Sequence, residues 1–217
     1  MVVIDPNVQN VGLIGASGEG KSYTFENILY PRLNKSILLI DPKNQYAQLK
    51  KAEWDQYTIS GENPITQYDK IMKGIRFNFI KTKKHFQIRW IVMDPQEGDF
   101  NRIVGPFADL GNVSIILEEA HMFKRSILKP FKELELTMRL RTGKHNKNSN
   151  VIWISQLVDV PKPVYANTQV LFLFKHWDNV IETLENNRTI PEGLTFKKQI
   201  GKKPDGSPVY NYHIISR

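Results

Sequence analysis

The stretch Val11-Gly-Leu-Ile-Gly-Ala-Ser-Gly-Glu-Gly-Lys-Ser22 decides the fold, because a short apolar run leads directly into a glycine-rich loop. The loop has the spacing Gly15-x-x-x-x-Gly20-Lys21-Ser22, which is the phosphate-binding P-loop pattern. Glycines let the backbone bend tightly and point successive N–H groups at phosphate oxygens, and a helix beginning near Gly20 adds its positive dipole end. An ordinary glycine-rich turn is the alternative, which the position between a strand pattern and a helix pattern disfavours. The residues expected to contact a nucleotide are Gly15, Ala16, Ser17, Gly18, Glu19, Gly20, Lys21 and Ser22.

Two side chains at the end of this loop carry the chemistry. Lys21 is expected to reach the β- and γ-phosphates, and the Ser22 hydroxyl is expected to ligate Mg²⁺. ATP and Mg²⁺ are therefore the expected cofactors. We interpret the chain as a nucleoside triphosphatase.

The composition is that of a globular protein, with 217 residues, 24% charged residues and no cysteine. The lack of cysteine excludes a disulfide framework and a thiolate metal site. No run approaches the roughly 20 apolar residues that span a bilayer, so no transmembrane segment is expected. The net charge of +8 suits a polyanionic partner, although solvated basic loops explain it equally well. The candidate DNA contacts lie in the clusters 81–84 and 144–147, ahead of 197–203: Lys81, Lys83, Lys84, Lys144 and Lys147.

Apolar runs of strand length alternate with helical patterns along the chain. We expect strands over residues 2–4, 11–14, 36–40, 76–80, 86–93, 113–117, 151–155 and 170–174. We expect helices over 21–29, 64–73, 99–110, 130–141 and 178–187, with a stop before Pro31 and an interruption at Gly105-Pro106. A C-terminal β-hairpin is expected from 194–202 and 209–215. This order predicts an α/β fold with a mainly parallel sheet and helices on both faces.

Four of the predicted strands end in residues that could take part in binding or catalysis: the P-loop, Asp41, Glu118-Glu119 and Gln156. In sheets of this kind, ligands bind at the carboxyl ends of the strands. Glu118 suits a second anchor for Mg²⁺, and Glu119 could accept a proton from an attacking water. A Glu-Glu pair that merely begins a helix is the alternative. Gln156 could hydrogen-bond the γ-phosphate or the lytic water.

Arg139 and Arg141 are candidates for a charge that one subunit offers to its neighbour's nucleotide. Arg139 follows Glu135 by four residues and could pair with it locally, so Arg141 is favoured. His121 has no second histidine at metal-ligand spacing and is expected to be structural or a relay.

The order of these motifs resembles that of the FtsK–HerA superfamily of DNA-pumping ATPases. The chain looks most like the genome-packaging ATPases of membrane-containing icosahedral double-stranded DNA viruses, including archaeal turreted viruses. The resemblance covers residues 8–175. The elements that carry it are Gly15-x4-Gly20-Lys21-Ser22, Asp41-Pro42-x-x-x-Tyr46, Glu118-Glu119-Ala120-His121, Arg141-x-Gly143 and Ser155-Gln156.

The resemblance implies a RecA-like core in which the strand ending at Gln156 lies between the P-loop strand and the Glu118 strand. By position, Lys21 and Ser22 would hold phosphate and Mg²⁺, Glu118 would be the metal-side acid, and Glu119 the catalytic base. Gln156 would be the sensor and Arg141 the finger that acts in a neighbouring subunit. The family often has Asp where this chain has Glu118.

The resemblance also implies partners. It implies a homo-oligomeric ring, commonly a hexamer, that threads double-stranded DNA without sequence preference through a basic channel. Capsid or inner-membrane vertex proteins are further expected partners, and the host cytoplasm or the virion is the expected location. We expect one ATPase domain over 1–217, with its core at 8–175 and a C-terminal extension at 176–217.

A nucleotide switch or a small-molecule kinase that does not act on DNA is the alternative function. The guanine-specific Asn-Lys-x-Asp motif is not matched, since Asn146-Lys147-Asn-Ser lacks the acidic position. A kinase lid with several arginines is not evident in the sequence either.

Overall fold

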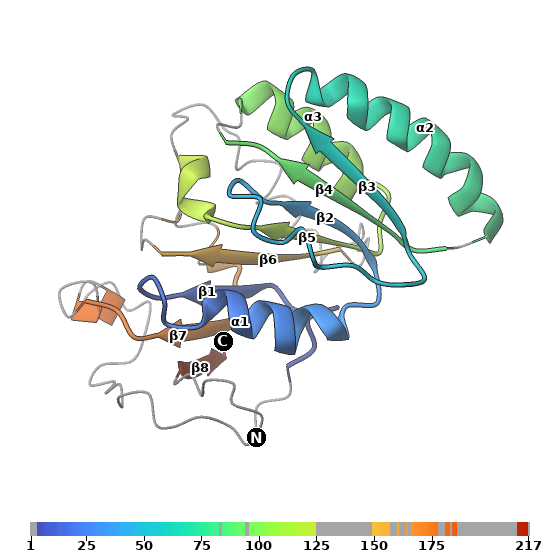
Figure 1. Cartoon of the computed structure of the whole chain (residues 1–217). Coiled ribbons are helices and arrows are strands. Elements are labelled where there is room, and N and C mark those ends of the chain that lie inside the picture. The colour runs from blue at the N-terminus through green and yellow to red at the C-terminus, as the bar shows by residue number, and fades with distance from the viewer. Residues whose placement is uncertain are drawn as a thin grey trace.

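The computed structural model describes residues 4–82, 84–93, 96–124, 149–156, 160, 164, 166–177, 181–182, 184–185 and 212–216, without the side chains of 76–82, 97 and 123–124. Within these ranges the chain forms one eight-stranded sheet in the order β3-β4-β2-β5-β6-β1-β7-β8 (Figure 1). The strands are β1 (Val11–Ile14), β2 (Ser36–Ile40), β3 (Asp55–Ser60), β4 (Phe86–Ile91), β5 (Val113–Leu117), β6 (Asn150–Ser155), β7 (Val170–Phe174) and β8 (Tyr212–Ser216).

The neighbouring strands are parallel, except that β7 and β8 are antiparallel. The α/β class, the mainly parallel sheet and an antiparallel C-terminal pair are therefore confirmed. The strand order that the resemblance implies is also present, because β6 lies between β1 and β5.

Both faces of the sheet are covered, because the buried strands are apolar on both sides. In β2, Leu38 and Ile40 face one core and Ile37 and Leu39 the other. The first core is covered by α2 (Pro64–Thr82) and α3 (Glu97–Ala108), and the second by α1 (Lys21–Thr24) and the turns after it (Figure 1). No described helix is long and apolar enough to cross a membrane.

The helix after the P-loop begins at Lys21 and continues as the π-helical turn η1 (Phe25–Leu29) and the 3₁₀ turn η2 (Tyr30–Arg32). The predicted helix over 21–29, with a stop before Pro31, agrees with α1 and η1, which end at Leu29. Pro31 stands at the start of η2, where a missing N–H costs no helical hydrogen bond.

The region between β2 and β4 differs from the prediction. Residues 55–60 form β3, which was not predicted, and the expected strand at 76–80 is wrong because α2 runs through it. Pro106 also lies inside α3, in its last turn, rather than interrupting it, and the helix forgoes the one hydrogen bond that an N–H at this position would make.

Other expectations fall partly on residues outside the described ranges. The helix at 130–141 and the hairpin strand at 194–202 lie outside them, as do residues 2 and 3 of the first expected strand; Ile4 is not in a strand. The described residues of 178–187 are helical. A short turn η3 (Ala120–Lys124) follows β5.

Candidate active site

The P-loop connects β1 to α1 and has the backbone that its glycines allow. Gly18 and Gly20 have φ values of 80° and 100°, a left-handed conformation that other residues rarely adopt. At Gly15, an added Cβ would lie 2.5 Å from the Cβ of Phe174, so β7 leaves room only for glycine. The Ala16 N–H donates to the Lys175 carbonyl at 2.9 Å. The loop is therefore fixed against the end of β7.

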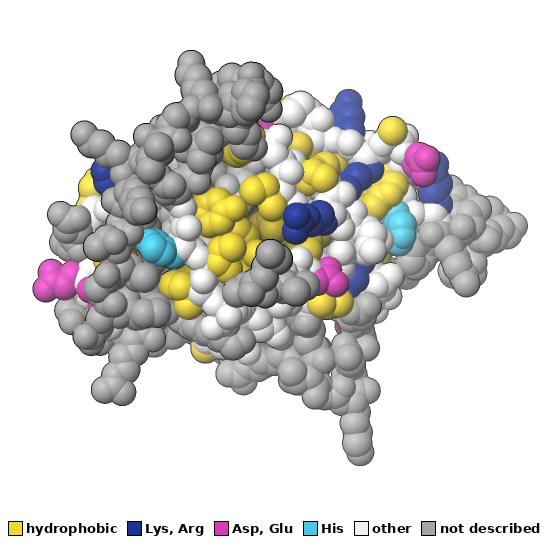
Figure 2. Space-filling model, turned by 90° about the horizontal axis from the view of Figure 1, so that it is seen from below, with side chains coloured by type: hydrophobic (Ala, Val, Ile, Leu, Met, Phe, Trp, Pro, Cys, Tyr) yellow, Lys and Arg dark blue, Asp and Glu magenta, His cyan; other side chains and the backbone are white. Residues whose placement is uncertain are grey.

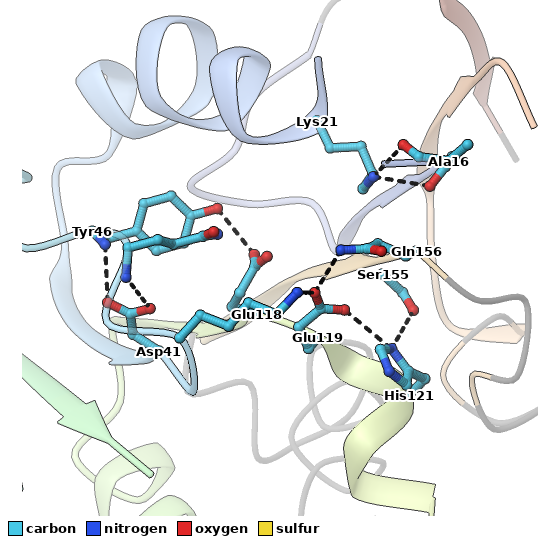
Figure 3. A network of polar contacts seen from close by, with 12 residues as sticks. Ala16, Lys21, Asp41, Tyr46, Glu118, Glu119, His121, Ser155 and Gln156 are labelled. Carbon is cyan, nitrogen blue, oxygen red and sulfur yellow. Dashed lines mark hydrogen bonds and ion pairs between the residues drawn. The ribbon is translucent and has the colours of Figure 1, made fainter. Parts of the chain in front are cut away.

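The Lys21 side chain is buried and folds over the P-loop. Its Nζ donates to the carbonyl oxygens of Gly15 at 2.9 Å and Ala16 at 2.7 Å (Figure 3). Burial lowers the pKa of this ammonium, and the carboxylates of Glu118 and Glu119 oppose the shift. The cation therefore lies close to two acidic groups at the mouth of the loop.

The strand order brings three of the polar strand ends together. Because β5, β6 and β1 are neighbours running in one direction, Glu118-Glu119, Gln156 and the P-loop share one edge of the sheet. Asp41 follows β2 on the other side of β5 and lies on the same edge.

Glu119 is almost completely buried, at 2% exposed, and has a left-handed backbone with φ of 52°. Such a conformation in a residue other than glycine is uncommon and concentrates at functional sites. Its Oε1 accepts a hydrogen bond from Gln156 Nε2 at 2.8 Å and pairs with the ammonium of Lys43. Its Oε2 lies 3.2 Å from His121 Nδ1. The candidate base thus has polar neighbours from three segments.

Glu118 is buried separately, with its Oε2 accepting a hydrogen bond from the Tyr46 hydroxyl at 3.0 Å. Burial and the neighbouring charge of Glu119 raise the pKa of Glu118 to about 8, which the hydrogen bond from Tyr46 opposes. A carboxyl with such a pKa gains from a nearby cation.

Three residues that contact the candidate site were not predicted as site residues: Lys43, Tyr46 and His176. Tyr46 was quoted within a motif but was given no role. Lys43 follows β2 within the same motif, so the motif was the available signal. His176 Nε2 lies 2.7 Å from the Gln156 carbonyl oxygen, and no pattern in the sequence predicts this contact. His121 contacts both Glu119 and Ser155, whose Oγ is 3.2 Å from Nδ1.

The described DNA-contact candidates are not near this edge. Lys84 lies two residues before β4, at the amino end of the strands, and its Nζ pairs with Asp55 at 2.6 Å. Lys81 is in the last turn of α2. Seen from below, lysine and arginine side chains of the described residues are scattered around a hydrophobic patch (Figure 2). Lys83, Arg139, Arg141, Lys144 and Lys147 lie outside the described residues.

The donor set suits Mg²⁺. No group of three or more His, Asp or Glu that could hold a metal occurs among the described residues. Mg²⁺, however, is usually held by one or two protein oxygens together with water and substrate phosphates. Ser22 and Glu118 supply a hydroxyl and a carboxylate, and both interact with Tyr46: burial raises the pKa of its phenol, as does Glu118, while a hydrogen bond with Ser22 lowers it.

Solved structures share this fold. The genome-packaging NTPase B204 of Sulfolobus turreted icosahedral virus 2, in complex with ATP-gammaS, matches with a TM-score of 0.59 and 14% identity over 88% of this chain and 89% of that chain. The DNA-packaging ATPase B204 of Sulfolobus turreted icosahedral virus matches with a TM-score of 0.56 and 15% identity over 84% of this chain and 83% of that chain. EssC (ATPases 2 and 3) from Geobacillus thermodenitrificans matches with a TM-score of 0.50 and 14% identity over 97% of this chain and 39% of that chain.

No protein-family model matches the sequence, and no curated protein matches it. At such low identities, similarity between structures shows the fold alone. The chain has the P-loop NTPase fold of these proteins, which confirms the predicted resemblance at the level of the fold.

Proposed function

We propose that this chain is an ATPase that moves double-stranded DNA, in the manner of a viral genome-packaging motor. The observation that carries the proposal is the meeting of Lys21, Glu119 and Gln156 at the carboxyl ends of β1, β5 and β6. Phosphoryl transfer to water needs charge neutralisation and an oriented water, and these residue types supply both.

The residues have separate roles in the proposed reaction. Backbone N–H groups of residues 15–22 and the Lys21 ammonium bind and orient the phosphates of ATP. Ser22 and Glu118 would hold Mg²⁺, which neutralises charge on the phosphates when it is bound. Glu119 takes the proton from the attacking water, and Gln156 orients this water or the γ-phosphate. These assignments retain the roles that the motifs predict.

Hydrolysis is tested by substitution of the two charged residues. Lys21→Ala should weaken ATP binding and hydrolysis together, whereas Glu119→Gln should leave binding intact and lower kcat by about 10²–10⁴-fold, the usual contribution of a general base. Phosphate release and binding of a fluorescent ATP analogue measure the two effects. Hydrolysis that is indifferent to both substitutions would contradict the proposed site.

The proposal for DNA rests on the net charge of +8 and on the B204 structures, whose names describe genome packaging and DNA packaging. We propose a hexameric ring of identical subunits, in which an arginine of one subunit reaches the nucleotide of the next. Arg141 is the first candidate for this arginine and Arg139 is the second. Lys81, Lys83, Lys84, Lys144 and Lys147 are the proposed DNA contacts. We also propose that residues 1–217 form one ATPase domain that works inside the host cell or at the virion, with capsid or inner-membrane vertex proteins as partners.

Duplex DNA should stimulate ATP hydrolysis, and its binding should weaken steeply with salt because phosphate contacts release counterions. Different sequences of one length should bind alike. A protein that stays monomeric with nucleotide and DNA, and whose hydrolysis ignores DNA, would instead be the switch or small-molecule kinase.

A further inference from the structure

The loop that follows β2 contacts both carboxylates at the end of β5. Tyr46 donates its hydroxyl hydrogen to Glu118 Oε2 at 3.0 Å, and Lys43 pairs through Nζ with Glu119 Oε1. The two donors come from one short segment, residues 41–46, and each reaches a different member of the acidic pair. Figure 3 shows the contact of Tyr46 with Glu118.

This loop is held firmly at its base. Asp41 is completely buried, and its two carboxylate oxygens accept the N–H groups of Gln45 and Tyr46, each at 3.0 Å. On the outer side, Arg89 of β4 donates to Asn44 Oδ1 at 2.8 Å and lies 3.8 Å from Asp41 Oδ2. The path of the loop is therefore fixed from two sides, which limits where its donors can lie.

The acidic pair needs such support. Glu118 and Glu119 are adjacent, like-charged when ionised, and nearly inaccessible to water, at 4% and 2% exposed. Oε1 of Glu119 is engaged by Lys43 and Gln156, whereas Oε2 lies 3.2 Å from His121 Nδ1. The orientation of the Glu119 carboxylate is therefore set mainly through Oε1.

We propose that the loop of residues 41–46 positions the acidic pair for catalysis, with Lys43 orienting Glu119 and Tyr46 orienting Glu118. The inference rests on the proposed ATPase function for its kinetic consequence. Lys43 and Tyr46 are positioning residues: they act through the carboxylates. A displaced catalytic group costs rate without weakening the binding of substrate.

The first test compares Lys43→Ala with Lys43→Arg. Lys43→Ala should lower kcat about 10–100-fold, the order expected for a misplacement near 1 Å, and should change KM for ATP by less than about threefold. Lys43→Arg keeps a cationic donor and should recover most of kcat. Lys50→Ala removes another exposed lysine, four residues beyond this segment, and should match the wild type. Equal kcat values for Lys43→Ala and the wild type would overturn the role of Lys43.

Tyr46→Phe tests the second contact. It removes the hydroxyl and keeps the ring, which packs edge-on against Phe25 at 5.3 Å between centroids. Tyr30→Phe is a matched control, since Tyr30 is buried, packs against the same Phe25 and donates to Gln87 at 2.7 Å. Tyr46→Phe should lower kcat about tenfold by releasing Glu118, whereas Tyr30→Phe should leave kcat unchanged. Equal losses in both variants would overturn the role of Tyr46.

A readout independent of hydrolysis separates this inference from the proposed function. Crystal structures of nucleotide-free Lys43→Ala and Tyr46→Phe should show Glu119 and Glu118, respectively, in new side-chain orientations, with the backbone of 41–46 unmoved. Carboxylates that keep their orientations would refute the positioning loop whether or not the protein hydrolyses ATP. If the carboxylates are displaced in the variants but the wild-type protein has no ATPase activity, the proposed function alone is refuted.

Discussion

The side-chain amide of Gln156 lies 2.8 Å, from Nε2 to Oε1, from the carboxylate of Glu119, and the two residues follow different strands of the sheet. The contact exists because β6 is inserted between β5 and β1. It joins the end of β6 to the candidate base through one side-chain hydrogen bond.

The contact predicts a difference between two substitutions of Gln156. Gln156→Ala removes the donor and should lower kcat roughly 10–100-fold, with little change in ATP binding. Gln156→Glu has nearly the same shape but sets a second charge against Glu119, so it should lose more activity than Gln156→Ala. Steady-state phosphate release and equilibrium nucleotide binding measure both effects. A Gln156→Glu variant as active as the wild type would contradict the contact.

The raised pKa of Glu118, about 8 against the usual 4.5, predicts a pH dependence of stability. Between these values the folded state holds a proton that the unfolded chain has released, so the free energy of unfolding falls as the pH rises. Glu118→Gln has no titrating group at this position, so its free energy of unfolding does not fall for this reason.

As the pH rises from about 5 to about 9, the wild type should lose about 4 kcal/mol that Glu118→Gln keeps. The thermal midpoint of Glu118→Gln should therefore rise relative to that of the wild type by roughly 8–15 °C, at 2–4 °C per kcal/mol. The measurement is thermal unfolding in buffer with a chelator. A constant difference between the two proteins over this range would show that the Glu118 pKa is not raised.

Asn10 predicts a stability effect away from the active site. It is buried, its Oδ1 accepts the Val151 N–H at 2.9 Å, and its Nδ2 donates to the Asn167 carbonyl at 3.0 Å. Asn10→Ala leaves these backbone groups without that partner and should cost about 1–3 kcal/mol of unfolding free energy. Chemical denaturation measures the loss. The exposed Asn27 bonds only within its own helix in the described contacts, and Asn27→Ala should cost much less.

Two glycines predict opposite effects of a single methyl group. At Gly74, inside α2, an added Cβ meets nothing within 4 Å, so Gly74→Ala should stabilise the protein by about 0.5–1 kcal/mol. At Gly15 the same atom would lie 2.5 Å from the Cβ of Phe174, so Gly15→Ala should lower the thermal midpoint and distort the P-loop. Thermal unfolding distinguishes them, and a stable Gly15→Ala variant would contradict the close approach of β7.

The fold was predictable where a strand is buried on both faces. Ile115–Leu117 and Val170–Phe174 are continuous apolar runs, and each lies in a strand of the structure. The edge strand β3 was missed because only Ile59 of its residues is buried, so Asp55–Ser60 contains no apolar run.

The prediction of a strand at the end of α2 failed for a related reason. Residues 76–80 alternate apolar and polar side chains, which favours a strand when they are considered alone. The buried residues Tyr68, Met72 and Ile75 recur at helical spacing just before this segment, and the helix continues beyond them over the core. Local alternation was outweighed by the longer period.

In the candidate site, the motif positions were predictable and most of the contacts between them were not. A motif places Glu119 and Gln156 at strand ends, and the strand order then follows from the resemblance. The pairing of Lys43 with Glu119 depends on how residues 41–46 curl back toward β5, and that path is set by Asp41 and Arg89 together. No periodicity or spacing in the sequence predicts this path.

The common direction of the strands sets Lys84 and the P-loop at opposite rims of the sheet. β4 has six residues, so the two rims are separated by about 20 Å at roughly 3.3 Å per residue. A load applied at the Lys84 rim would pull on the strands along their length, against several rows of hydrogen bonds in shear. In the proposed motor, a displacement at the Lys84 rim would therefore have to pass along the strands to reach the P-loop.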